Sequence, residues 1–350
     1  MASHRGKVRI CLAGTGRAGM VHALNFASSV PDAELVAIVD PDPNAASRPA
    51  RELGVDQVFC DLDQALGGVD FDAVCIGAPT FAHAEIAVKA AREGKHILCE
   101  KPMALTLAEC DAMIDAAKES GVVLQIGFMR RFDESFVEAK RAVDSGAVGE
   151  PVLIKSLTRG PGLPGSWYYS VERSNGLLAE VNSHDFDTVR WFMGEEIASV
   201  FSRAGNFKCR ELAERYPRLY DYVLVSIGFE SSKMGLVEGA CPAGYGYDSR
   251  LEVVCTEGLV FAGRLNEESV VVCSSGGGVA QPISSSWRRK FKDAYLAEDR
   301  HFVECVLGNS PPAVGGEEGR AAVHAVIAAN LSITTGRPVR LSEVAAAKTE

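Results

Sequence analysis

An adjacent acid and base, Glu100 and Lys101, stand where an apolar run of the chain ends, directly before Pro102. A lysine at the end of a strand can donate a hydrogen bond to a substrate oxygen and stabilise the negative charge that develops there during a reaction. Taken alone, such a pair is more typical of a surface ion pair. Its role therefore depends on the elements around it.

A glycine-rich turn, GTGRAG, lies between the first apolar run and a helical pattern. Its first glycine permits a tight turn, its second lets a pyrophosphate approach the backbone, and its third lets helix and strand pack closely. The N-terminus of the following helix offers N–H groups to an anion. The alternative is a glycine-rich turn in an unrelated α/β protein. The residues of the motif are Gly14, Thr15, Gly16, Arg17, Ala18 and Gly19.

An acidic residue follows the glycine motif at a distance typical of dinucleotide-binding domains. Asp40 ends the next strand-like run, 21 residues after Gly19, where a carboxylate would bind the ribose hydroxyls of adenosine. The same negative charge would repel a 2′-phosphate. The sequence therefore predicts NAD as the cofactor and disfavours NADP.

Another strand-like run ends in residues that we expect at the sheet edge where ligands bind in doubly wound folds. We expect these residues to contact the dinucleotide, with His83 stacking on it or hydrogen bonding to it. The alternative for His83 is a histidine at the start of a helix without any ligand. The residues concerned are Ala78, Pro79, Thr80 and His83.

Short β-branched runs alternate with helical patterns over about the first 130 residues, which predicts βαβ units on a parallel sheet. Thr106 and Glu109 form a capping box at the start of one helix, and Gly121 is typical of the end of that helix. The predicted strands are Val8–Ala13, Leu35–Asp40, Ala73–Ile76, His96–Glu100 and Val122–Gly127, and the predicted helices are Ala18–Ser28, Asn44–Leu53, Ala82–Glu93 and Leu107–Ser120.

A different pattern begins near Phe128, with strand-like runs, tight links and one helical pattern over Leu178–Trp191. It predicts an α+β domain with a largely antiparallel open sheet. We therefore expect an α/β chain with a Rossmann domain over residues 1–128 and a second domain over 129–350, whose C-terminal helices are candidates to pack back on the first. The predicted strands of the second domain are Val152–Thr158, Ala198–Ala204, Tyr222–Phe229, Lys233–Gly239, Leu251–Thr256, Leu259–Ala262 and Ser269–Cys273, and its C-terminal helices are Ala294–Leu307 and Glu317–Thr334.

The composition is that of a globular chain of 350 residues, with 47% hydrophobic residues and a formal net charge of −10. The acidic excess argues against binding of nucleic acid or an anionic membrane through a basic surface, and no apolar run approaches the ~18 residues of a membrane span. The ten cysteines are scattered without a CxxC pair, and the first strand-like run leaves no room for a signal peptide before it. We therefore expect a cytoplasmic protein with reduced cysteines.

The motifs together resemble those of the glucose–fructose oxidoreductase/inositol dehydrogenase (Gfo/Idh/MocA) family. The glycine motif, Asp40 and the run APTFAHAEIAVKAAREGKHILCEKP are similar to its first domain, and the EKP tripeptide is the most specific mark. The segments QIGFMRRFD, YGYD and WRRKF resemble those of its bacterial myo-inositol 2-dehydrogenases, so the likeness covers nearly the whole chain. It implies NAD-dependent oxidation of a secondary ring hydroxyl of an inositol to the ketone, with Lys101 as a catalytic residue and a second domain for substrate binding and oligomerisation.

The resemblance also implies a helix in the second domain with an acid and a histidine four residues apart, and the matching residues are Glu180 and His184. Positions four apart share one face of a helix, so we expect both to address one substrate. By resemblance, His184 accepts the hydroxyl proton, Lys101 bonds to the same oxygen, and Glu180 fixes a neighbouring hydroxyl or the other two side chains. The family usually has aspartate at position 180 and an apolar residue at 182, so we expect Glu180 and Asn182 to affect which polyol binds.

Several further residues are expected near the ligands. Arg130 is expected to line the nicotinamide or substrate pocket, and an aromatic side chain such as Trp167 to pack on the C–H surface of a cyclitol. No metal site is expected, because the helix spacing directs Asp185 and Asp187 apart. The expected substrate-binding residues are Lys101, Arg130, Trp167, Glu180, Asn182, His184 and Tyr245, while Glu100, Lys101 and Arg130 also join the cofactor-binding set.

Two alternatives to an inositol dehydrogenase are compatible with the sequence. A sugar, glycoside or aminocyclitol dehydrogenase of the same family keeps the cofactor and changes the substrate. A non-catalytic NAD-binding redox sensor belongs to another class of protein, and the retention of Lys101 and His184 argues against it. The resemblance also implies a homotetramer in which sheet faces of the second domain pair.

Overall fold

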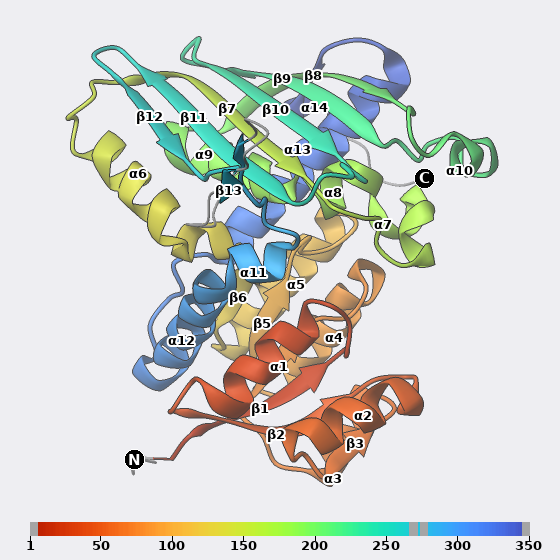
Figure 1. Ribbon diagram of the computed structural model, residues 1–350. Helices are drawn as coiled ribbons and strands as arrows, with labels where there is room; N and C mark the ends of the chain where they lie inside the picture. Colours follow the sequence, from red (N-terminus) through yellow and green to blue (C-terminus); the bar gives the residue numbers. More distant parts are fainter. Residues whose placement is uncertain (1–5, 266–271, 274–278, 345–350) are drawn as a thin grey trace. The chain divides into compact units, whose positions relative to one another are not determined.

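The chain folds into two units, each built on its own sheet (Figure 1). The computed structural model describes residues 6–265, 272–273 and 279–344. The first unit runs to Met129 and includes Asp293–Arg320, and the second comprises Arg130–Lys292 and the chain from Ala321 onward. The sequence-based division left Asp293–Arg320 with the second domain, whereas the structure groups this segment with the first unit.

A parallel sheet of six strands forms the centre of the first unit. Its strand order, β3-β2-β1-β4-β5-β6, is that of a dinucleotide-binding Rossmann fold, and all neighbouring strands run parallel. The prediction of a parallel Rossmann sheet is therefore confirmed. The strands are β1 (Val8–Ala13), β2 (Ala33–Val39), β3 (Gln57–Phe59), β4 (Ala73–Ile76), β5 (His96–Glu100) and β6 (Leu124–Gly127).

The helices of the first unit begin and end on local signals. The predicted capping box is confirmed: the Thr106 hydroxyl accepts the N–H of Glu109 at 3.2 Å, and the Glu109 carboxylate accepts the N–H of Thr106 at 2.9 Å. Gly121 ends the same helix at φ +66. The helices are α1 (Gly19–Ser28), α2 (Pro43–Leu53), α3 (Leu62–Gly68), α4 (His83–Arg92), α5 (Leu107–Ser120) and α12 (Lys292–Gly308), and the 3₁₀ turn η1 (Thr80–Ala82) precedes α4.

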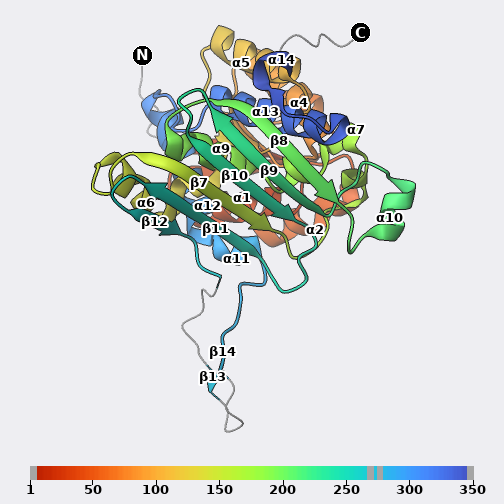
Figure 2. The ribbon, with the colours of Figure 1, turned by 90° about the horizontal axis from the view of Figure 1, so that it is seen from above.

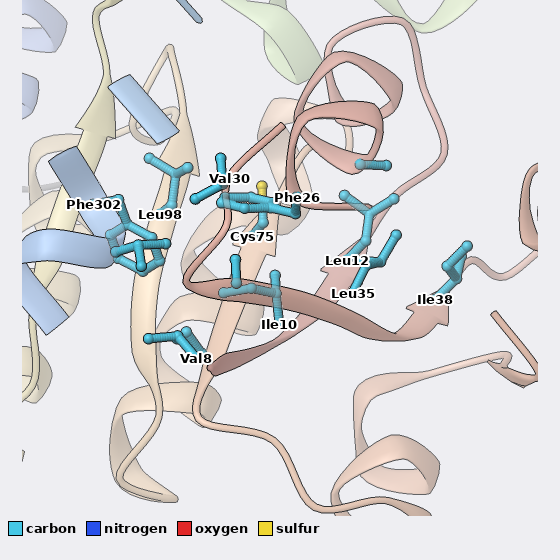
Figure 3. Packing of buried hydrophobic residues seen from close by; sticks show 14 of the residues in the cluster. Val8, Ile10, Leu12, Phe26, Val30, Leu35, Ile38, Cys75, Leu98 and Phe302 are labelled. Carbon is cyan, nitrogen blue, oxygen red and sulfur yellow. The ribbon is translucent and has the colours of Figure 1, made fainter. Parts of the chain in front are cut away.

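The core of the first unit covers its sheet with apolar side chains from several helices (Figure 3). Five large apolar side chains of this core are at most 1% exposed: Ile10 and Leu12 of β1, Leu98 of β5, Phe26 of α1 and Phe302 of α12. A parallel sheet is buried on both faces, so its strands consist of nearly continuous apolar residues. Helix α12 joins this core although it lies far along the chain, which explains why Asp293–Arg320 belongs to the first unit.

The second unit is built on a mixed sheet of seven strands in the order β12-β11-β7-β10-β9-β8-β15. Only β7 and β10 pair in parallel among these neighbours, and the others are antiparallel. The prediction of a largely antiparallel sheet is therefore confirmed. Its strands are β7 (Pro151–Arg159), β8 (Ile197–Gly205), β9 (Tyr222–Phe229), β10 (Met234–Ala240), β11 (Asp248–Cys255), β12 (Leu259–Ala262) and β15 (Val339–Arg340).

Figure 2 shows this sheet face on, with α6 and α9 behind its strands. None of the helices in the described part of the chain is long and apolar enough to cross a membrane. A separate pair of short strands, β13 (Val272–Cys273) and β14 (Val279–Ala280), contains the end of the predicted strand Ser269–Cys273, whose first three residues lie outside the described ranges. The helices of the second unit are α6 (Glu134–Asp144), α7 (Val171–Ser174), α8 (Gly176–Glu180), α9 (Ser183–Met193), α10 (Arg210–Arg215), α11 (Trp287–Lys290), α13 (Gly316–Thr335) and α14 (Leu341–Val344), with 3₁₀ turns η2 (Met129–Phe132) and η3 (Ser166–Tyr169).

The predicted continuous helix over Leu178–Trp191 is wrong, because two residues interrupt it. Helix α8 ends at Glu180, and Val181 and Asn182 leave regular helical geometry before α9 begins. The Asn182 amide donates to Asp185 Oδ2 at 2.8 Å and to the Glu238 carbonyl of β10 at 3.0 Å. A Cβ on Gly239 would lie 2.0 Å from Asn182 Oδ1, so the break requires a glycine on the facing strand.

A fully buried carboxylate, Asp185, fastens α9 to the sheet. It accepts hydrogen bonds from Ser156 Oγ at 2.6 Å and Thr158 Oγ1 at 2.7 Å, both on β7, and from Asn182. It also forms an ion pair of 2.8 Å with Arg130, which is 1% exposed. A buried ion pair is stable only when such additional donors satisfy it, and here all of them come from the second unit.

We predict that Asp185→Asn destabilises the second unit by about 3–5 kcal/mol, because the variant leaves the buried guanidinium of Arg130 without a counter-charge. The three tryptophans of the chain, Trp167, Trp191 and Trp287, all belong to this unit. Urea unfolding, monitored by tryptophan fluorescence, therefore measures the loss in the free energy of unfolding of the second unit.

The matched control is Glu138→Gln, which breaks an ion pair with Arg141 on the exposed side of α6. Exposed pairs contribute at most about 1 kcal/mol, so this variant should unfold close to the wild type. Equal losses in the two variants would show that the Asp185 network does not hold α9 in place.

Candidate active site

The glycine-rich turn brings three segments of the first unit into close contact. Gly14 has φ +100, and a Cβ there would lie 2.5 Å from the backbone nitrogen of Ala78. A Cβ on Gly19 would lie 2.1 Å from the Gly14 carbonyl oxygen, and one on Gly77 would lie 2.5 Å from Gly19 Cα. Only glycine fits at these positions, so α1 begins tightly against the ends of β1 and β4.

The outer side of this turn is open for a phosphate. Gly16 and Arg17 are exposed, and Ala18 is half-buried immediately before α1. The first N–H groups of a helix have no partner within it and, together with the helix dipole, favour an anion. The exposure of this turn and the start of α1 thus fit a pyrophosphate, and the contact itself stays a prediction.

Asp40 follows β2 and is tied to the same turn. Its Oδ2 accepts hydrogen bonds from the backbone nitrogen of Thr15 at 2.9 Å and from Thr15 Oγ1 at 2.6 Å, and its Oδ1 accepts one from the backbone nitrogen of Asp42 at 3.0 Å. A carboxylate can accept about four hydrogen bonds, so the half-buried Asp40 has capacity for a ribose hydroxyl. The turn and Asp40 thus fit the adenosine half of NAD, and the negative charge opposes a 2′-phosphate.

His83 connects the ends of β4 and β5. Its Nε2 lies 2.8 Å from the Ala78 carbonyl oxygen, its Nδ1 lies 2.9 Å from that of Pro102, and the side chain is 1% exposed. Burial lowers the pKa of His83, although the two carbonyls oppose this effect. A neutral imidazole has one N–H, so it donates to one of these two carbonyls at a time. The contact of His83 with a dinucleotide stays a prediction.

The other predicted residues at the end of β4 differ in exposure. Ala78 and Pro79 are half-buried, while Thr80 is 3% exposed and begins η1. The carboxyl ends of β1, β2, β4 and β5 lie at one edge of the parallel sheet, where doubly wound folds bind ligands. The first unit thus places its predicted cofactor-binding residues along this edge.

Glu100 and Lys101 end β5 and begin the segment after it. Glu100 is 4% exposed, and its Oε2 accepts the backbone N–H of Lys101 at 3.0 Å. Its Oε1 lies 3.1 Å from Nε2 of His22 on α1. The alternative of a plain surface ion pair is wrong for this segment, because the Glu100 carboxylate is buried and engaged with other groups, while the Lys101 side chain is half-buried.

In the second unit, Glu180 and His184 lie on two successive helices. Glu180 is the half-buried last residue of α8, and His184 is 5% exposed on the first turn of α9. The expectation that both share one face of a single helix is therefore wrong. The His184 carbonyl accepts a hydrogen bond from Thr188 Oγ1 at 2.7 Å, and the neighbouring Asp185 is fixed to β7.

Asn182 and Arg130 are occupied by contacts within the second unit. Asn182 is 0% exposed, and its amide nitrogen is shared between Asp185 and the Glu238 carbonyl. The Arg130 guanidinium donates to Asp185 and to Thr158 Oγ1. Their geometry gives both residues a part in the Asp185 network, and the expected ligand contacts of both residues stay predictions.

The two predicted aromatic contacts lie nearer the surface. Trp167 is half-buried in η3. Tyr245 is 44% exposed, and its hydroxyl donates to Asp248 at 2.9 Å and accepts from Arg159 at 3.0 Å. Their roles in substrate binding stay predictions.

No group of three or more histidine, cysteine, aspartate or glutamate side chains in the described ranges could hold a metal ion. Asp187 forms a two-bond ion pair with Arg131, at 2.6 and 3.0 Å. Asp185 is occupied by the donors described above. Both aspartates beside His184 therefore serve the packing of α9.

Sequence reasoning missed a buried group of ionisable residues around His22. His22 Nδ1 lies 2.6 Å from Asp299 Oδ1, and Glu298 is fully buried beside them. The signal was present, because Glu298 and Asp299 precede Phe302 and Val303 at the spacing that gives one apolar helix face. Acidic residues on such a face are buried and require partners.

Comparisons with known proteins agree with these observations. Residues 8–128 match the family described as "Oxidoreductase family, NAD-binding Rossmann fold", and residues 136–261 match the "GFO/IDH/MocA C-terminal domain". The chain is 38% identical over 335 residues to scyllo-inositol 2-dehydrogenase (NAD(+)) of Bacillus subtilis, with 96% of each chain covered. It is 34% identical to myo-inositol 2-dehydrogenase of Thermotoga maritima, covering 96% of this chain and 99% of the relative.

A solved structure extends the likeness to the whole fold. The scyllo-inositol dehydrogenase of Lactobacillus casei, crystallised with bound NAD(H) and scyllo-inositol, superposes with a TM-score of 0.90 at 28% identity. The match covers 96% of this chain and 99% of that one. With both domains matched and relatives above 30% identity over nearly the full length, the chain belongs to the Gfo/Idh/MocA family of oxidoreductases.

Proposed function

We propose that the protein is an NAD-dependent dehydrogenase that oxidises a secondary ring hydroxyl of an inositol to the ketone. One observation carries the proposal: two relatives that match nearly the full length of the chain, at 38% and 34% identity, are named inositol 2-dehydrogenases. The glycine turn and Asp40 support it independently, because their geometry fits NAD. The two relatives are named for the scyllo and the myo isomers, so both isomers are candidate substrates.

In the proposed reaction, different residues of the chain bind the cofactor and act on the substrate. NAD, when bound, supplies the hydride acceptor, while the glycine turn and α1 hold its pyrophosphate and Asp40 its adenosine ribose. His184 takes the proton of the reacting hydroxyl, Lys101 donates a hydrogen bond to its oxygen, and Glu180 accepts one from a neighbouring hydroxyl. The substrate thus loses a hydride and a proton and becomes a ketone.

Free thiols support a location in the reducing cytoplasm. Nine cysteines in the described part of the chain are free, and seven of them are buried. Proteins of oxidising compartments commonly carry disulfides, whereas buried thiols in reduced proteins pack as small hydrophobic groups. We propose a cytoplasmic location on this ground.

Assays of the purified protein with a panel of polyols identify the substrate. We expect formation of NADH with myo- or scyllo-inositol, and much slower reaction with glucose, glucosides or an aminocyclitol. The negative charge of Asp40 makes NADP the poorer cofactor, so we expect less NADPH than NADH. Absorbance at the reduced-nicotinamide band measures both.

The panel also tests the alternatives. Faster reaction with a sugar or an aminocyclitol than with any inositol would show that the protein is a dehydrogenase of that substrate class instead. A protein that binds NADH but oxidises no polyol in the panel would favour the redox sensor.

We predict that Lys101→Ala and His184→Ala each lower kcat by at least about 100-fold, because each removes a group that acts on the reacting oxygen or its proton. NADH affinity, measured by fluorescence, should change little. Lys118→Ala is the matched control, because Lys118 is an exposed lysine near the end of α5. Normal turnover in either catalytic variant would contradict the role of that residue.

We also propose that the protein is a homotetramer in which the outer face of the second sheet forms one interface. Alternate residues of the strands point to this face, and the register aligns Met234 of β10 with Leu153 of β7, then Val254 of β11 and Leu259 of β12. Four large apolar side chains on the face are 45–66% exposed, and such a patch is typical of a protein interface. They are Leu224, Met234, Leu259 and Phe261.

We predict that Met234→Glu dissociates the tetramer, because it places a charge among the exposed apolar side chains that this interface would bury. The control is Leu307→Glu on α12, since Leu307 is 51% exposed and lies on no sheet. Light scattering after size exclusion measures the mass of both variants. A monomeric wild type, or a Met234→Glu variant that keeps the wild-type mass, would contradict this interface.

A further inference from the structure

A cluster of ionisable residues lies buried in the first unit, and the reaction above gives a role to none of its members. We define the His22 cluster as His22 and Asn25 of α1, Glu100 of β5, and Glu298 and Asp299 of α12. His22, Glu298 and Asp299 are 0% exposed, and Glu100 is 4% exposed. A buried group stays charged only when it contacts a group of opposite charge. The contacts within the cluster therefore bear on the charge of each member.

Both ring nitrogens of His22 face carboxylate oxygens. Nδ1 lies 2.6 Å from Asp299 Oδ1, and Nε2 lies 3.1 Å from Glu100 Oε1. A neutral imidazole has one N–H, whereas the imidazolium has two and can donate to both carboxylates. Burial alone lowers the pKa of His22, but Asp299 and Glu100 outweigh it and hold this pKa well above its usual range.

Two further ionisable groups, Cys75 and Glu298, lie near His22, and neither carboxyl oxygen of Glu298 has a hydrogen-bond partner among the described residues. Burial raises the pKa of the Cys75 thiol on β4 to about 12, and burial holds the pKa of the Glu298 carboxyl well above its usual range. The rings of Tyr295 and Phe26 pack against the imidazole, with centroids at 5.4 and 6.5 Å. The groups that face the His22 ring nitrogens are therefore the Glu100 and Asp299 carboxylates. Burial raises the pKa of Asp299, and His22 opposes this effect.

Each of these carboxylates uses its second oxygen as well. Asp299 Oδ2 accepts a hydrogen bond from the Asn25 amide at 2.7 Å, which fixes the carboxylate against α1. Glu100 Oε2 accepts the backbone N–H of Lys101 at 3.0 Å. A chain of hydrogen bonds thus runs from Asp299 through His22 and Glu100 to the main chain of Lys101.

We propose that His22 is a positioning residue for the oxidation reaction. Held between Asp299 and Glu100, it keeps the Glu100 carboxylate oriented, and so fixes the main chain from which Lys101 reaches the substrate oxygen. This inference rests on the proposed role of Lys101. It assigns no contact with substrate to His22.

The first test removes the charge of His22 and then restores the hydrogen bonds. In His22→Gln the amide oxygen faces one of the two carboxylates, which leaves that carboxylate without a donor. We therefore expect kcat to fall by about 10- to 100-fold, as is typical when a catalytic group is misplaced. The KM of the polyol should change little. When His22→Gln is combined with Asp299→Asn, the new amide at position 299 can donate to the amide oxygen at position 22. The amide nitrogen at position 22 can then donate to Glu100, so we expect this double variant to recover most of kcat.

The second test separates positioning from a purely structural role. Asp299 raises the pKa of His22, so Asp299→Asn lowers it, and the imidazolium is lost at a lower pH. The high-pH limb of the kcat profile should therefore move to lower pH in Asp299→Asn. Glu298→Gln is the matched control, because it replaces a buried neutral carboxyl by a neutral amide of similar shape, and its profile should stay that of the wild type.

A third measurement needs no turnover. Hydrogen exchange of peptides that cover residues 97–104 should become faster in His22→Gln than in the wild type, because the Lys101 N–H loses its oriented acceptor. The Glu298→Gln control should exchange at the wild-type rate.

The outcomes separate the two proposals. If the wild type oxidises the polyol and His22→Gln keeps its kcat and its exchange rate, the positioning role is wrong while the proposed function stands. If the wild type oxidises no polyol, the proposed function fails, and unchanged exchange in His22→Gln would still overturn the positioning role. A double variant no more active than His22→Gln, or an unmoved profile in Asp299→Asn, would reduce His22 to a structural part of the core.

Discussion

A charge that is taken out of water must meet an opposite charge, and each unit of this protein satisfies that constraint beside a proposed catalytic residue. In the first unit, the His22 imidazolium lies between Asp299 and Glu100, and Glu100 holds the backbone of Lys101. In the second, Arg130 lies against Asp185, the residue that follows His184. Removing one partner of a buried pair is far more damaging than removing an exposed one. Both proposed catalytic residues are therefore attached to main chain that the buried charges fix.

The sequence predicted the features that depend on neighbouring residues and missed those that depend on distant ones. The glycine turn and the Thr106 capping box follow from local signals, because each is set within a few residues of the chain. The helix break at Val181 and Asn182 does not, since the partner that holds Asn182 away from helical geometry is the Glu238 carbonyl on β10. The place of α12 in the first unit also depends on tertiary packing, and here the sequence predicts the C-terminal helices as candidates to pack on the first domain. The three-residue strand β3 is too short to show any period.

The break at Val181 and Asn182 has a cause in packing. The Asn182 amide is fully buried and therefore needs partners within the protein. Asp185 and the Glu238 carbonyl accept from Asn182, and Gly239 leaves the space for its side chain. These contacts account for the amide nitrogen, whereas the buried amide oxygen has no hydrogen-bond partner among the described residues. Glu180, the last residue of α8, is by contrast half-buried.

The net charge of −10 does not indicate how a neutral substrate binds. The charges close to the proposed catalytic residues bear more directly on the reaction. Oxidation of a hydroxyl develops negative charge on one oxygen, and a donor fixed beside that oxygen stabilises it without reorganisation during the reaction. In the proposed reaction this donor is Lys101, and its main chain is held by Glu100, which in turn is held by His22 on α1. The same helix begins at the glycine turn that fits the pyrophosphate. Helix α1 therefore links the two requirements of the proposed hydride transfer, because it begins at the glycine turn and carries His22 in its first turn.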